Sequence, residues 1–159
     1  MKIEEGKVYL LNYESKFQFG DLTQEVMLSL MKDGRFAAPL LERQLVCEFP
    51  ELEYVDQKGH DHVHKDTGQK YDAKNFTRRG MKFMPSSQIG AGRKFNKEIS
   101  HSHARELIYI CCDIVEFPLV RCKFVAGKDL IEEYPKCQIP FGEREKFFTS
   151  DYTVELLTH

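Results

Sequence analysis

The chain of 159 residues has the length of one ordinary domain, with room for a hydrophobic core but not for two independent ones. Its 23 basic and 25 acidic residues leave a formal net charge of only -2, which excludes a protein that binds polyanions through its overall charge. No apolar run approaches the ~20 residues of a membrane span and the N-terminus lacks a basic–apolar signal pattern, so we expect a cytoplasmic protein without membrane contact.

Residues 1–50 are predicted to be mainly helical after a short strand or extended arm at residues 7–13. Asp21 can cap a helix with Gln24 as its partner, and that helix carries apolar residues at helical spacing: Val26, Met27, Leu30 and Met31. Gly34 interrupts this pattern. A second helix is predicted over residues 37–47, ended by Pro50, with an apolar side formed by Leu40, Leu41 and Leu45.

After Pro50 the period changes to that of strands. Leu52, Tyr54 and Val63 alternate with polar residues, a turn follows at residues 65–68, and residues 69–77 are predicted to return as a strand. Residues 78–96 are irregular, 97–105 helical, 107–115 and 119–125 strands, and 129–134 a helical turn. We therefore expect one α/β domain over residues 1–159, a mixed β-sheet flanked by helices, with a core at 51–134 and a tail at 135–159.

Asp72 and Lys74 are the most informative pair, because residues two apart in a strand share a face about 6.5 Å apart. A two-residue loop at Asp66 and Thr67 would place Asp61 directly opposite Asp72, with Cβ atoms about 5 Å apart. Gly68 favours instead a three-residue loop with a bulge, which sets the two carboxylates on a diagonal. Two carboxylates can share one Mg²⁺, and a lysine can steady the attacking water or the charge on a phosphate. The same residues are also common on solvated hairpin tips.

A basic stretch follows this strand. From residue 73 to residue 97 the sequence has no acidic residue, and beyond Lys74 its positive charges are Arg78, Arg79, Lys82, Arg93, Lys94 and Lys97. Such a stretch beside a metal site suits binding to a phosphate backbone, while the alternative is a flexible, solvated loop.

Histidines and cysteines offer competing sites. His60, His62 and His64 would share one face of a strand, and His101 and His103 add two more imidazoles, so a zinc site is an alternative. Alternate residues of one strand stand too far apart for all three to bind one ion, which favours DNA contacts or plain exposed histidines. The five cysteines are odd in number and lack CxxC spacing, so we expect reduced structural thiols.

The segment Gly59-His60-Asp61, followed by Thr67-Gly68-Gln69-Lys70-Tyr71-Asp72-Ala73-Lys74, resembles the PD-(D/E)XK nuclease superfamily and, within it, type II restriction endonucleases. Ser100-His101-Ser102-His103 is similar to a histidine-rich DNA-reading segment of such an enzyme. The resemblance covers roughly residues 59–134. The chain departs from the family pattern in three ways: His60 replaces the frequent Pro, Asp72 replaces the commoner Glu, and the spacer is one residue longer.

The resemblance implies a restriction-endonuclease-like core in which Asp61 and Asp72 bind Mg²⁺ and Lys74 acts near the nucleophilic water. It makes His101 and His103 candidate major-groove contacts. Glu42 could orient an additional metal or be a plain polar helix position, and Asp56 and Asp66 remain possible substitutes for Asp61.

The implied function is sequence-specific, Mg²⁺-dependent hydrolysis of double-stranded DNA leaving 5′-phosphate ends. We expect a homodimer, with the helices of residues 21–47 as candidate dimer surface. The alternatives are a structure-specific nuclease for repair or junction resolution, and a non-catalytic nucleic-acid-binding module.

Overall fold

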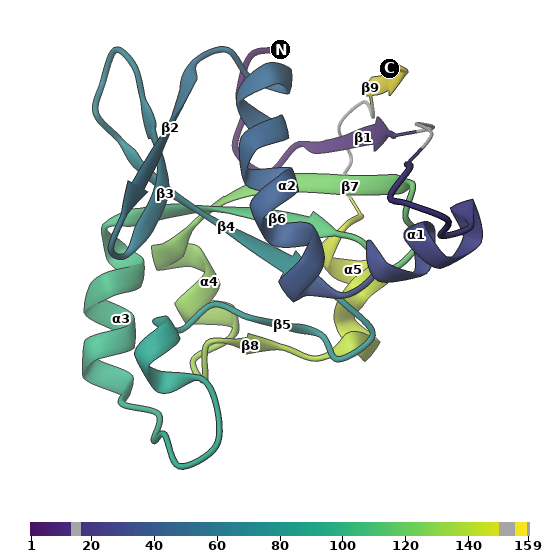
Figure 1. The fold of residues 1–159 in the computed structure, drawn as a ribbon. Helices are drawn as coiled ribbons and strands as arrows, with labels where there is room; N and C mark the ends of the chain where they lie inside the picture. The colour runs from purple at the N-terminus through teal and green to yellow at the C-terminus, as the bar shows by residue number, and fades with distance from the viewer. Residues whose placement is uncertain (14–16, 150–154, 159) are drawn as a thin grey trace.

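The computed structural model describes residues 1–13, 17–149 and 155–158 and shows a seven-stranded mixed sheet (Figure 1). The strand order is β2-β3-β4-β6-β7-β1-β9. Two neighbouring pairs are parallel, β4 with β6 and β1 with β9, and the other pairs are antiparallel. The strands are β1 (Val8–Asn12), β2 (Leu52–Gln57), β3 (His60–His64), β4 (Lys70–Phe76), β6 (Leu107–Asp113), β7 (Leu119–Ala126) and β9 (Glu155–Thr158).

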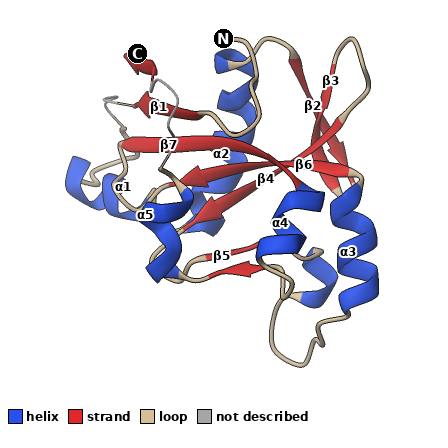
Figure 2. Ribbon diagram, turned by 180° about the vertical axis from the view of Figure 1, so that it is seen from behind, coloured by secondary structure: helices blue, strands red, loops and turns tan. Residues whose placement is uncertain are grey.

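Helices cover both faces of this sheet, as the two opposite views show (Figures 1 and 2). On one face lies α2 (Gly34–Glu48), preceded by α1 (Gln24–Leu30). The other face carries α3 (Lys97–Arg105), α4 (Gly127–Glu133), α5 (Arg144–Phe147), the two-stranded sheet of β5 (Met81–Lys82) with β8 (Gln138–Ile139), and the 3-10 turns η1 (Ser86–Gln88) and η2 (Phe141–Glu143). The α/β class with a mixed sheet flanked by helices is confirmed. Among the described helices, none is long and apolar enough to cross a bilayer.

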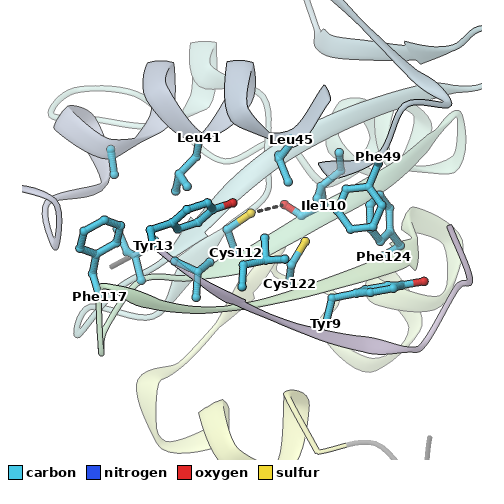
Figure 3. Packing of buried hydrophobic residues seen from close by; sticks show 14 of the residues in the cluster. Tyr9, Tyr13, Leu41, Leu45, Phe49, Ile110, Cys112, Phe117, Cys122 and Phe124 are labelled. Atoms are coloured by element: carbon cyan, nitrogen blue, oxygen red, sulfur yellow. Dashed lines mark hydrogen bonds between the residues drawn. The ribbon is translucent and has the colours of Figure 1, made fainter. Parts of the chain in front are cut away.

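The core beneath α2 is built from facing aromatic rings and aliphatic side chains (Figure 3). Leu41 and Leu45, four residues apart, point from α2 onto the sheet, where Phe49 and Phe124 meet edge to face at 4.8 Å. Leu40 lies outside this core and is 49% exposed, so its predicted place on the apolar side was wrong. Successive helix residues are about 100° apart, and Leu41 occupies the inward direction.

Local capping decides where the two N-terminal helices begin. Thr23, and not the predicted Asp21, caps α1, because its hydroxyl accepts the backbone N–H of Val26 at 3.3 Å. Asp33 caps α2 by accepting the N–H of Arg35 at 2.9 Å, so Gly34 opens that helix three residues earlier than predicted. A carboxylate that satisfies a free N–H offsets the helix-breaking tendency of the glycine.

The predicted alternating segment after Pro50 is two strands. It reverses at Gly59, whose φ of +96° lies in the left-handed region that glycine tolerates best, and β2 and β3 form an antiparallel hairpin. The next turn has four loop residues, 65–68, because His64 and Gln69 form the last backbone pair, with the His64 N–H donating to Gln69 at 2.8 Å. The four-residue loop keeps the register expected for a two-residue loop, because its two extra residues, Lys65 and Gly68, lie one on each side of Asp66 and Thr67.

A close contact between α3 and α4 generates a stability prediction. A Cβ added to Gly127, the first residue of α4, would lie 2.0 Å from the backbone oxygen of the buried Ala104. We expect Gly127→Ala to force the two helices apart and lower the free energy of unfolding by about 1–3 kcal/mol in urea titrations. Gly142→Ala is the matched control, because its added Cβ meets nothing within 4 Å. Equal urea midpoints for the two variants would contradict this packing.

Candidate functional site

Asp72 and Lys74 lie on the same face of β4, as their spacing predicts. The Lys74 Nζ is 2.7 Å from Oδ2 of Asp72, and the Asp72 side chain is 9% exposed. On the neighbouring parallel strand, Asp72 is paired with Tyr109 and Lys74 with Cys111, both buried. The aspartate is therefore held in a largely apolar part of the sheet, with the lysine as a direct counter-charge.

Asp61 faces this pair from β3. The register His62 with Tyr71, continued by one residue, sets Asp61 opposite Asp72, which is the direct arrangement and not the diagonal one. The ladder between β3 and β4 ends at the pair of His62 with Tyr71. Beyond it, Oδ2 of Asp61 accepts the backbone N–H of Ala73 at 3.0 Å. One carboxylate oxygen thus replaces a strand carbonyl as acceptor. The Asp61 and Asp72 carboxyl groups are close enough to interact by hydrogen bonding.

Glu42 on α2 completes an acidic cluster that reaches the site from a different element. Burial raises the pKa of Glu42 from 4.5 to about 7, and the charges of Asp61 and Asp72 add to this while Lys74 opposes it. Burial likewise raises the pKa of Asp72 from 3.8 to about 7, against the lowering effect of Lys74. Three carboxyl groups near one lysine leave uncompensated negative charge, and Glu42 and Asp72 hold protons near neutral pH. A divalent cation would relieve the same repulsion.

The arrangement fits Mg²⁺ better than a metal ion that is coordinated by three or more protein side chains. Among the described residues, no three His, Cys, Asp or Glu side chains are placed to hold a metal ion together. Mg²⁺ keeps several waters and is commonly bound through one or two carboxylates, so Asp61 and Asp72 supply a sufficient donor set. Asp66 does not belong to it, because it is exposed in the turn beyond the far end of β3. The side chain of Asp56 lies outside the described part of the chain.

The two histidines of α3 have different surroundings. Residues two apart in a helix point about 200° apart. His101 therefore turns away from the sheet hairpin and places its Nε2 2.9 Å from the backbone oxygen of Pro135. His103 lies against Gly59, where an added Cβ would be 3.1 Å from its ring. Burial lowers the pKa of His103, and the charge of Lys74 lowers it further, so His103 lies on the Lys74 side of α3.

The histidines of β3 make contacts within the fold. His62 is fully buried, with Nε2 2.6 Å from the Glu42 backbone oxygen. His64 accepts the backbone N–H of Asp66 at Nδ1 and lies 3.8 Å from the Glu51 carboxylate. The imidazoles of His62 and His64 are therefore held by contacts with the protein itself, which explains their positions without a shared zinc ion.

The predicted basic surface is divided among three segments. Arg78 and Arg79 are exposed in the turn after β4, and Lys82 is exposed on β5. Arg93 and Lys94 lie in the loop before α3, and the Arg93 guanidinium donates to the backbone oxygens of Ser86 and Ile89 at 2.5 and 2.9 Å. Arg93 therefore organises its own loop. A hollow along α3 beside His103 has acidic residues in its lining, which consists of Glu98, Ile99, Ser102, His103 and Glu106.

Sequence reasoning had only a weak signal for Glu42 and none for the position of His103. Glu42 is a polar residue between Leu41 and Leu45, the two inward-facing leucines of α2, and that placement beside a buried stripe is the signal that could have identified it. No known protein family matches the chain, and neither curated proteins nor solved structures include a significantly similar one.

The raised carboxyl pKa values predict how the metal-free protein responds to pH. Between pH 4 and 7, folded Asp72 binds a proton that it releases on unfolding, so its contribution to stability is lost as pH rises through 7. We expect Asp72→Asn to gain roughly 2 kcal/mol of unfolding free energy relative to wild type between pH 5 and pH 8. Urea titrations in EDTA measure this difference. The exposed Asp66→Asn should show no such trend, and a wild-type advantage that grows with pH would contradict the proposed burial.

Proposed function

We propose that this protein is a Mg²⁺-dependent deoxyribonuclease of the type II restriction endonuclease kind, which hydrolyses phosphodiester bonds of double-stranded DNA and leaves 5′-phosphate ends. The observation that carries the proposal is the cluster of Asp61, Asp72 and Glu42 around Lys74. β3, β4 and α2 each bring an acid to one place, together with one amine, in a largely buried setting.

Each side chain has a role in this reaction. Asp61 and Asp72 would hold the Mg²⁺, which supplies a water of lowered pKa and neutralises charge on the phosphate. Lys74, held beside Asp72 at 2.7 Å, is a preoriented cation directed at the attacking water or the phosphate oxygen. Removal of one such preorganised group commonly costs about 10²–10³ in rate. Glu42 has a raised pKa and, without being a third ligand of that ion, is suited to accepting a proton from the attacking water.

The alternatives use the same residues in different ways. A structure-specific nuclease would share the acidic cluster, and the division of basic side chains among three segments fits branched DNA as well as a straight duplex. A non-catalytic binding module would need only the basic side chains. A cluster of buried acids weakens binding to phosphate in the absence of a metal, which favours catalysis over binding alone. The five free cysteines, four of them buried, fit the reducing cytoplasm in which we place the enzyme.

We also propose that the enzyme is a homodimer formed through α1 and α2. Much of the exposed large apolar surface belongs to this region: Phe19 at 71%, Leu22 at 44%, Val26 at 41%, Leu30 at 36%, Phe36 at 39% and Leu40 at 49%. Val26 and Leu30, four residues apart, align along one side of α1, and Leu22 lies just before the helix begins. An apolar stripe is complementary to its own copy, as a two-fold interface requires.

The nuclease assay is a digestion of plasmid DNA. We expect wild type to produce discrete fragments with Mg²⁺ and none with EDTA, and Lys74→Ala to cut at least 100-fold more slowly while it still binds DNA. Lys128→Ala is the matched control, because it also removes one lysine but from the exposed side of α4. It should cut like wild type. Circular dichroism checks that each variant is folded.

An intact plasmid in every lane would reject the restriction-enzyme proposal for that DNA. Cleavage of four-way junctions or flaps under the same conditions would then support the structure-specific alternative. Cutting by Lys74→Ala at the wild-type rate would remove the lysine from the mechanism.

Sedimentation velocity tests the dimer. We expect wild type at micromolar concentration to sediment as a dimer and Val26→Lys as a monomer, because a charge in the centre of the apolar stripe must be desolvated on association. Ile99→Lys, which replaces a 56% exposed apolar residue on α3, should leave the dimer intact. A monomeric wild type would contradict the proposed interface.

A further inference from the structure

His62 is a fully buried polar residue that the chemistry described above does not use. It follows Asp61 in β3 and points to the opposite face, beneath α2. Its Nε2 lies 2.6 Å from the backbone oxygen of Glu42. A carbonyl oxygen can only accept, so Nε2 carries the hydrogen. Nδ1 is buried and, within the described part of the chain, has no hydrogen-bond partner.

The bond from His62 is directed at the turn of α2 that bears Glu42. Two bonds that reach the α2 backbone from other segments lie at its two ends: Asn75 Nδ2 donates to the Gly34 oxygen at 3.0 Å, and the N-terminal amine donates to the Glu48 oxygen at 2.8 Å. At the middle of the helix, His62 is supported by Tyr54, whose ring is 5.8 Å away. The Arg43 guanidinium lies 4.5 Å above that same tyrosine ring.

An apolar residue would fill this space without the cost of a buried, half-satisfied imidazole. What an apolar residue lacks is the N–H that ties β3 to the Glu42 backbone. Through two successive residues, β3 therefore supplies the Asp61 carboxylate and holds the backbone of the residue that supplies the Glu42 carboxylate. The relative position of the two acids depends on this connection.

We propose that His62 is a positioning residue, which sets the Glu42 carboxylate against Asp61 and Asp72 by holding the Glu42 backbone. The inference rests on the proposed function, because it assigns His62 to the metal-binding geometry of that same site. Loss of the bond lets the middle of α2 shift, and misplacement by about 1 Å can cost about 10²-fold in a site of this kind.

A double-mutant cycle on the full chain tests the inference, with Mn²⁺ alone as the calorimetric probe. We expect His62→Leu to weaken Mn²⁺ binding about tenfold, and Glu42→Gln to weaken it to a similar extent, because the Glu42 carboxylate attracts the ion by its charge without being a third direct ligand. The double variant should bind no more weakly than Glu42→Gln, because His62 acts only through Glu42. His62→Gln, whose side-chain amide can donate to the same carbonyl, should recover much of the loss.

Asn75→Ala is the matched control, since it removes a strand-to-α2 bond of the same kind at the other end of the helix. We expect it to lower the urea midpoint but to leave Mn²⁺ affinity within about twofold of wild type. Additive losses in the cycle, or an equal loss of affinity in Asn75→Ala, would overturn the proposal and leave His62 as a general packing residue.

Amide hydrogen exchange separates failure of this inference from failure of the proposed function. His62→Leu should speed exchange at residues 40–46 and leave residues 34–38 unchanged, whereas Asn75→Ala should do the reverse. Unchanged exchange around Glu42 overturns the positioning role whatever the metal data show. A wild type that binds no Mn²⁺ overturns the proposed function, even if the exchange pattern shows that His62 holds the helix.

Discussion

The parallel ladder between β4 and β6 is the constraint on which the rest of the molecule depends. All seven residues of β4 pair with the seven of β6, from Lys70 with Leu107 to Phe76 with Asp113. Parallel neighbours cannot be joined by a tight turn, so the chain must cross over one face of the sheet, and that crossover contains β5, η1 and α3. With α2 on the opposite face, β4 is covered on both sides. Its alternating side chains are thereby divided between the core beneath α2, which takes Tyr71 and Ala73, and the opposite side, which carries Asp72 and Lys74.

Two buried aspartates show how differently this fold treats charge. Asp113, 1% exposed, is bound by Arg121 at 2.7 Å and by Arg144 at 2.9 Å, so two guanidinium groups surround one carboxylate. Asp72 has one lysine and shares it with the carboxyl groups of Asp61 and Glu42. The first arrangement is compensated and ties α5 to the sheet. The second is uncompensated in the protein alone, which is the condition that a cation-binding site requires.

The elements predicted from the sequence follow from local chemistry. The helix over residues 97–105 and the strands after it agree closely with α3, β6 and β7, because their periods and apolar runs are continuous. The errors arise where two local signals compete. Thr23 caps α1 in place of Asp21, and Gly59 divides a segment that was predicted as one alternating strand. In each case, a hydrogen bond or a backbone angle at one residue decided the outcome.

The sequence by itself determined that Asp72 and Lys74 share a face, because the two-residue repeat of a strand is a property of the local backbone. It also limited the register of Asp61 to two choices set by the turn. The tertiary structure alone decided that Glu42 joins these residues, that His103 lies against Gly59 while His101 contacts Pro135, and that His62 connects β3 to α2. Those relations join residues 19 to 44 positions apart in the chain. Their distances depend on how helices pack on the sheet, and no local repeat encodes that packing.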